Sequence, residues 1–154
     1  MSIEQELAPL VKTVVVPTTP ERAFELFTAE LGRWWPLASH SIAAEQATDV
    51  RFEGTVGGQI VEYTADGPVG TWGTVSTWNP PTSVNFSWHP GTDPTQAGQV
   101  TVRFTPTGDG TEVELTHTGW ELRPDGARMR QNYDSGWPVV LTAYANHPRL
   151  STPE

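Results

Sequence analysis

Between residues 49 and 118 the sequence alternates apolar and polar residues in six short runs, separated by turns rich in glycine and proline. A period of two is typical of strands that bury one face, and short turns join antiparallel neighbours. We predict three consecutive hairpins, formed by residues 49–67, 71–91 and 98–120. Together they indicate an antiparallel sheet rather than parallel strands joined by helices.

The third hairpin predicts its own register. A turn of four residues at 107–110 places Pro106 opposite Thr111 and Arg103 opposite Glu114. Arginine and glutamate then face each other across the strands as an ion pair. The other face is apolar on both strands, so both strands agree on which side of the sheet is buried.

The second hairpin leaves one orientation undecided. Its turn places Val75 opposite Phe86, and strict alternation then turns Trp72 and Trp78 toward the outer face. Two exposed indoles are unusual on a soluble sheet. Either a β-bulge turns an indole inward or something covers this face, and both alternatives stay open.

Helical patterns flank the predicted hairpins. A first strand at residues 10–16 ends before a helix with Thr19 as N-cap, Pro20 at its first position and Gly32 as C-cap. Aromatic and aliphatic residues near the C-terminus recur at spacings of three and four. They predict a helix from about residue 133 to 146, packed across the concave face of the sheet.

This order of elements predicts an α+β fold. One curved antiparallel sheet of about seven strands is wrapped on a long C-terminal helix, with a short helical element near the N-terminus. We expect a single domain over residues 1–154, with its core at about 10–147. The space between sheet and helix is the natural place for a pocket.

The composition excludes several classes of partner. The net charge is −9, and Lys12 is the single lysine, so nucleic acid and anionic membrane surfaces are poor partners. The absence of cysteine excludes disulfides and thiolate metal sites. No apolar stretch is long enough to span a membrane, and residues 1–10 lack the basic residues of a secretory signal. We therefore expect a cytoplasmic protein.

Motifs for catalysis, metals and cofactors are not found. There is no nucleophile elbow and no phosphate-binding loop before a helix, so no catalytic residue and no cofactor is predicted. The strand carboxylates Glu62 and Glu114 are predicted on the solvated face. The four histidines do not have the spacing of a metal site: His40, His89, His117 and His147.

The apolar face of the last strand ends in His117, with Trp120 close behind. One interpretation makes His117 a hydrogen-bonded residue at the end of a half-buried strand. The other makes it a polar group that faces a ligand or moves a proton. In either case a buried imidazole should stay neutral near pH 7 unless a carboxylate is close.

The chain has seven tryptophans, and many of its aromatic side chains fall on inward positions. Aromatic side chains often do no more than fill a core, but so many bulky rings also suit an aromatic pocket with a few polar groups. We predict these ten residues as the cavity lining: Trp35, Phe86, Trp88, Val102, Leu115, His117, Trp120, Trp137, Leu141 and Tyr144.

Several segments resemble one known superfamily in the same order. They include "VVVPTTPERAFELFT", "GRWWP", "VGGQIVEY", "WGTVSTWNPPTSVNFSW", "GTEVELTHTGW" and "YDSGWPVVL", and they span about residues 14–144. The chain is similar to the START-related, helix-grip proteins called SRPBCC. Within them it is most similar to the branch of the activator of the ninety-kilodalton heat-shock protein ATPase.

This resemblance implies three candidate functions. The first is binding of an apolar or aromatic small molecule between sheet and helix. The second is a cyclase or aromatase reaction in the same cavity, with His117 or Tyr144 transferring a proton. The third is a co-chaperone-like role with a protein partner, for which outward-facing Trp72 and Trp78 would supply a docking patch.

Overall fold

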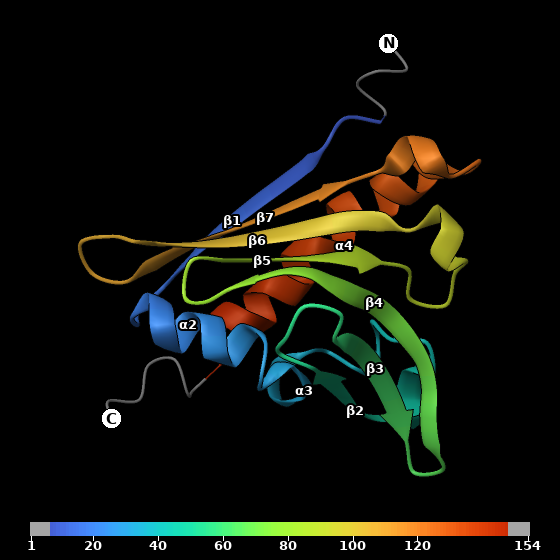
Figure 1. Cartoon of the computed structure of the whole chain (residues 1–154), viewed down its shortest axis with the longest axis horizontal. Helices are drawn as coiled ribbons and strands as arrows, with labels where there is room; N and C mark the ends of the chain where they lie inside the picture. Colours follow the sequence, from blue (N-terminus) through green and yellow to red (C-terminus); the bar gives the residue numbers. More distant parts are fainter. Residues whose placement is uncertain (1–6, 148–154) are drawn as a thin grey trace.

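The computed structural model of the chain describes residues 7–147 (Figure 1). The ends of the predicted 1–154 domain lie outside the described residues, and so do most of residues 1–10, which the sequence predicts not to be a secretory signal. The strands are β1 Leu10–Val16, β2 Ala47–Phe52, β3 Gln59–Thr64, β4 Gly67–Asn79, β5 Ser83–Trp88, β6 Gly98–Pro106 and β7 Thr111–Thr118. The α-helices are α2 Pro20–Phe27, α3 Leu31–Trp34 and α4 Gly126–Ala145. The short 3-10 helices are η1 Ala44–Gln46, η2 Pro94–Gln96 and η3 Trp120–Leu122.

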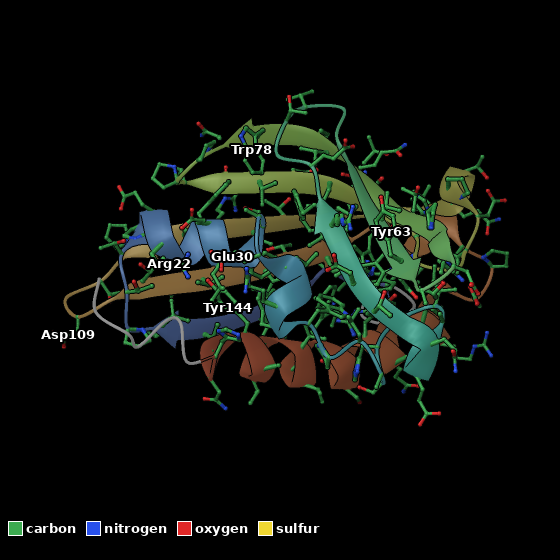
Figure 2. The ribbon with its side chains drawn as sticks, turned by 90° about the horizontal axis from the view of Figure 1, so that it is seen from below. Arg22, Glu30, Tyr63, Trp78, Asp109 and Tyr144 are labelled. Carbon is green, nitrogen blue, oxygen red and sulfur yellow. The ribbon has the colours of Figure 1, made fainter. Side chains whose placement is uncertain are left out.

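The strands form a seven-stranded antiparallel sheet in the order β1-β7-β6-β5-β4-β3-β2. The sheet curls, and α4 passes across one of its faces (Figures 1 and 2). Helices α2 and α3 connect β1 to the opposite edge of the sheet, where β2 lies. The predicted α+β class and the curved seven-stranded sheet are therefore confirmed.

The predicted registers are confirmed as well. In the third hairpin Pro106 pairs with Thr111, and Arg103 pairs with Glu114 across an N–O distance of 3.9 Å. In the second hairpin the expected partner of Phe86 is its partner in the structure. Alternation and turn length alone were sufficient here because both strands of each hairpin bury the same face.

Two β-bulges in β4 decide the orientation of its tryptophans. The register shifts between Val75 and Thr77, so that Trp78 comes to lie opposite buried Val84. A second shift in the pairing with β3 leaves Trp72 between two paired residues. Trp72 is fully buried and Trp78 is half-buried against the core. Strict alternation was thus wrong for both residues, because each bulge reverses the side that the next side chain faces.

The first helix is shorter than the sequence predicts. Thr19 does cap it, because its Oγ1 accepts a hydrogen bond from the backbone N–H of Arg22 at 3.2 Å. However, α2 ends at Phe27, and Gly32 lies inside α3 rather than at a C-cap. A Cβ on Gly32 would lie 2.0 Å from Oδ1 of Asp49. Close packing of α3 on β2, rather than capping, therefore requires this glycine.

The C-terminal helix begins earlier than predicted, at Gly126 rather than near Tyr133. Charged residues in its first turns make the apolar spacing harder to recognise in the sequence there. Pro138 lies in the second half of the helix. The buried side chains of its inner face are Trp137, Val140, Leu141 and Tyr144. They pack against the sheet and the first helices, and aromatic rings contact one another through much of this core.

Candidate functional site

A cavity of about 510 Å³ lies where α4, the segment after α3 and the end of β5 meet. Its walls come from three separate parts of the chain: residues 35–42, residues 88–91 and the α4 residues between 129 and 140. The lining residues are Trp35, Ser39, His40, Ser41, Ile42, Trp88, Pro90, Gly91, Met129, Asn132, Tyr133, Gly136, Trp137 and Val140. Its volume lies within the usual range for sites that bind small molecules.

Three indole rings form the apolar floor of this cavity. The ring centroids of Trp35 and Trp88 are 5.8 Å apart, and those of Trp88 and Trp137 are 5.3 Å apart. Each indole N–H already has a partner: the carbonyl of His40 at 2.7 Å, the hydroxyl of Tyr133 at 3.1 Å and Nδ1 of His117 at 3.0 Å. The N–H groups are satisfied within the protein, so the floor offers a ligand mainly apolar ring surface.

The rim of the cavity is polar but carries no fixed charge. Ser39 Oγ and His40 Nδ1 lie 2.7 Å apart, and Ser41 Oγ donates to the carbonyl of Leu37. Among the described residues that line the cavity there is no Asp, Glu, Lys or Arg. Burial raises the pKa of the Tyr133 phenol, which therefore stays protonated and can donate a hydrogen bond.

Glu62 lies beneath this rim and corrects a prediction. We expected it on the solvated face, but its side chain is fully buried. Its carboxylate accepts hydrogen bonds from the backbone N–H groups of Ile42 and Ala43, each at 2.7 Å, and from Nε1 of Trp72 at 2.8 Å. Alternation with buried Ile60 would have placed it inward. The sequence left the register of this strand uncertain, and the partners that hold the carboxylate lie ten or more residues away in sequence.

His117 lies behind the floor of the cavity rather than on its wall. It is 2% exposed, and its Nδ1 accepts the hydrogen bond from Trp137. Its ring packs on Trp120 with a centroid separation of 4.1 Å. Burial lowers the pKa of His117 to about 3, so the imidazole is neutral near pH 7, as the sequence predicts. In this position it orients Trp137 and does not face the large cavity.

The ten predicted lining residues therefore fall into three groups. Trp35, Trp88 and Trp137 line the cavity of about 510 Å³. His117 and Trp120 line an adjoining space of about 20 Å³, together with Trp88. The remaining five are buried in the packed core and lie outside the lining of both spaces: Phe86, Val102, Leu115, Leu141 and Tyr144.

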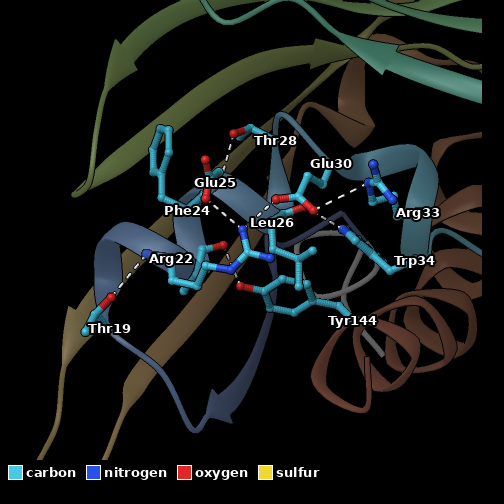
Figure 3. Close-up of polar contacts among 11 residues, drawn as sticks. Thr19, Arg22, Phe24, Glu25, Leu26, Thr28, Glu30, Arg33, Trp34 and Tyr144 are labelled. Carbon is cyan, nitrogen blue, oxygen red and sulfur yellow. Dashed lines mark hydrogen bonds and ion pairs between the residues drawn. The ribbon is translucent and has the colours of Figure 1, made fainter. Parts of the chain in front are cut away.

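Tyr144 lies toward the C-terminal end of α4, close to an ion-pair cluster rather than to the cavity (Figure 3). Its hydroxyl donates to the carbonyl of Ala23 at 2.8 Å, and burial raises the pKa of the phenol well above its ordinary value. Arg22 bridges Glu25 and Glu30 through Nη1 at 2.7 and 2.5 Å, which raises the pKa of the guanidinium further. These contacts join α2, α3 and α4 and are best explained as structural.

A curled antiparallel sheet closed by a long C-terminal helix is the helix-grip fold of the START-related proteins. Residues 17–145 match the family described as Activator of Hsp90 ATPase homolog 1-like protein, and the chain belongs to this family. The family resemblance seen in the sequence is thereby confirmed. No match among curated proteins was found.

Three solved structures illustrate the range of similar proteins. An anthrahydroquino-γ-pyrone synthase, Txn09, complexed with SUM, is 33% identical over 90% of this chain and 95% of that chain, with a TM-score of 0.64. The Aha1 dimer from Colwellia psychrerythraea is 17% identical over 90% and 94%, with a TM-score of 0.67. Protein MLL2253 from Mesorhizobium loti is 22% identical over 89% and 93%, with a TM-score of 0.64. The latter two show likeness of fold alone.

Within residues 7–147 no three His, Cys, Asp or Glu residues lie close enough together to hold a metal ion. None of the helices in the same range is both long and apolar enough to cross a membrane.

Proposed function

We propose that the protein binds a small aromatic molecule in the cavity between α4 and residues 35–42. The observation that carries this proposal is the floor of three indoles, whose N–H groups are all occupied and whose surface is left for stacking. An uncharged polar rim above such a floor suits a planar ligand with a few oxygen atoms. The sequence predicted the floor but placed the cavity deeper in the core.

Filling the cavity should weaken binding without harming the fold. Gly136 lines the cavity from α4, and a Cβ placed there would have its nearest neighbour, Nε2 of His40, at 4.0 Å. We expect Gly136→Leu to lower the affinity for phenylnaphthylamine, a neutral fluorescent probe, about tenfold or more. The midpoint of thermal unfolding should stay equal or rise, because glycine in a helix costs about 1 kcal/mol relative to alanine.

The matched control is Ser135→Leu, because Ser135 is exposed on the same helix and does not line the cavity. It adds the same side chain one residue away and should leave the affinity unchanged. The measurement is a fluorescence titration of each purified variant with the probe. If wild-type protein does not bind the probe saturably, or if Gly136→Leu binds it as well as wild type does, the cavity is not the binding site.

The relationship to the synthase favours a second function in the same cavity. The 33% identity extends over nearly all of both chains, and that protein is named for forming a fused pyrone. On this basis the chain would bind an oxygen-rich aromatic substrate and promote ring closure. Incubation with linear aromatic polyketides, followed by mass spectrometry, tests it: a product that forms with wild type and not with Gly136→Leu supports catalysis. Products that form equally with both proteins refute it.

A co-chaperone-like role has less support within the described residues. The patch expected for it consisted of outward-facing Trp72 and Trp78, but Trp72 is fully buried and Trp78 is half-buried against the core. Cytoplasmic location remains our expectation, on the basis of a chain without cysteine.

A further inference from the structure

The polar rim contains one histidine whose ring is held in place by its neighbours. His40 lines the cavity, and its carbonyl accepts the hydrogen bond from Nε1 of Trp35 at 2.7 Å. Ser39 Oγ lies 2.7 Å from Nδ1 of the same imidazole. The backbone and one ring nitrogen are therefore both fixed, which leaves the orientation of the ring largely determined.

The hydrogen bonds of Ser39 indicate which ring nitrogen carries the proton. Its Oγ is also 3.4 Å from the carbonyl of Pro36, a group that can only accept. A hydroxyl has one proton, so both contacts are hydrogen bonds only if Ser39 donates to Pro36 and accepts from N–H of His40. The imidazole then carries its proton on Nδ1 and a lone pair on Nε2.

The Nε2 atom faces α4 at Gly136, where the helix carries no side chain. A Cβ built on Gly136 would lie 4.0 Å from it, with no nearer neighbour. Among the described residues Nε2 has no hydrogen-bond partner. Glycine at this position keeps open the space beside a nitrogen that can accept a hydrogen bond, and both residues line the cavity.

The geometry points to His40 Nε2 as the acceptor for a hydroxyl group of the bound ligand. The ligand class is therefore a phenol or an enol. Its planar ring stacks on the indole floor, and its hydroxyl group donates a hydrogen bond to Nε2 of His40. Ser39 acts as a positioning residue that sets the tautomer. This inference rests on the proposed binding function and deepens it, because it names the polar group that the ligand must carry.

Two probes that share the same rings, one with a free hydroxyl and one with that hydroxyl methylated, test the inference. Naphthol can donate a hydrogen bond, whereas methoxynaphthalene has the same rings and cannot. Calorimetric titration should show that wild-type protein binds naphthol about three- to tenfold more tightly, the range expected for one net hydrogen bond. In His40→Phe this preference should disappear through weaker binding of naphthol, while the affinity for methoxynaphthalene stays unchanged.

A second variant tests whether Ser39 positions the imidazole of His40. Ser39→Ala leaves the imidazole in place but frees its tautomer and rotation, so the preference for naphthol should shrink without vanishing. A preference for naphthol that persists in full in His40→Phe, or equal affinity of wild type for the two probes, overturns the assignment of His40 and leaves the cavity proposal intact. Failure of wild type to bind either probe overturns both.

Discussion

Glu62→Ala is expected to lower the free energy of unfolding by about 3 kcal/mol, because it leaves one buried and two partly buried N–H groups without an acceptor. Two of these are the backbone N–H groups of Ile42 and Ala43, and the third is the indole N–H of Trp72. The carboxylate joins the rim of the cavity to the middle of β3 through two hydrogen bonds at once. Urea unfolding followed by tryptophan fluorescence measures the effect.

The backbone conformation next to the rim also depends on this carboxylate. Ala44, which directly follows the bound N–H groups, has a backbone φ of 51°, in the left-handed region that alanine rarely adopts. Such a conformation persists only where its surroundings hold it. Loss of the Glu62 contacts should therefore change the rim at residues 39–42 and also lower the affinity for the phenylnaphthylamine probe.

Glu114→Ala is the matched control for Glu62→Ala. Glu114 also lies in a strand, but it is partly exposed and its nearest cation, Arg103, is 3.9 Å away. Exposed pairs of this kind contribute about 0–1 kcal/mol, so this variant should unfold almost like wild type. If the two alanine variants lose the same stability, Glu62 does not hold the rim as described.

The sheet could be predicted from the sequence because the residues that determine each strand pair lie close together in the chain. In the third hairpin a turn of four residues and two alternating strands determine every pair, including Arg103 with Glu114. The β4 bulges could not be predicted in this way. A bulge adds a residue to one strand only, and its position depends on the partner strand, which the pattern of β4 alone does not contain.

The candidate site could be predicted only in part, for a related physical reason. The indole floor lies on regular elements or directly beside them, and Trp88 and Trp137 fall on the inner positions of their strand and helix. The rim at residues 39–42, by contrast, lies within an irregular segment at residues 36–43, and irregular segments have no period. Its position is set by contacts with Glu62 and Trp35, and such contacts between distant residues are visible only in three dimensions.

Acidification should destabilise the protein by way of His117. Its folded-state pKa is about 3, lowered by burial, whereas an unfolded histidine titrates near 6.5. Because the folded pKa is the lower one, the unfolded chain takes up a proton first as the pH falls. This contribution to stability is complete above pH 6.5 and is lost at about 1.4 kcal/mol per pH unit between pH 6 and 4. The total loss by pH 4 is on the order of 3 kcal/mol.

The aromatic neighbours of His117 supply no negative charge that would stabilise the protonated imidazole. The aromatic rings that contact it are those of Trp120, Tyr133 and Trp137, and Nδ1 already accepts the hydrogen bond from Trp137. A proton on Nδ1 would break that bond and place a charge among apolar rings. Tyr133 cannot supply a negative charge in this range, because burial raises the pKa of its phenol.

His117→Gln isolates this effect from the other titrations of the chain. A glutamine can still offer an oxygen to the indole N–H of Trp137, but it has no group that titrates. Carboxylates such as Asp125, whose pKa is held at about 2 by Arg123 and Arg128, are common to both proteins and cancel in the difference. The difference in unfolding free energy between wild type and variant should therefore slope with pH between 6 and 4, as about one proton requires. Parallel curves over that range would mean that the His117 pKa is not lowered in the folded protein.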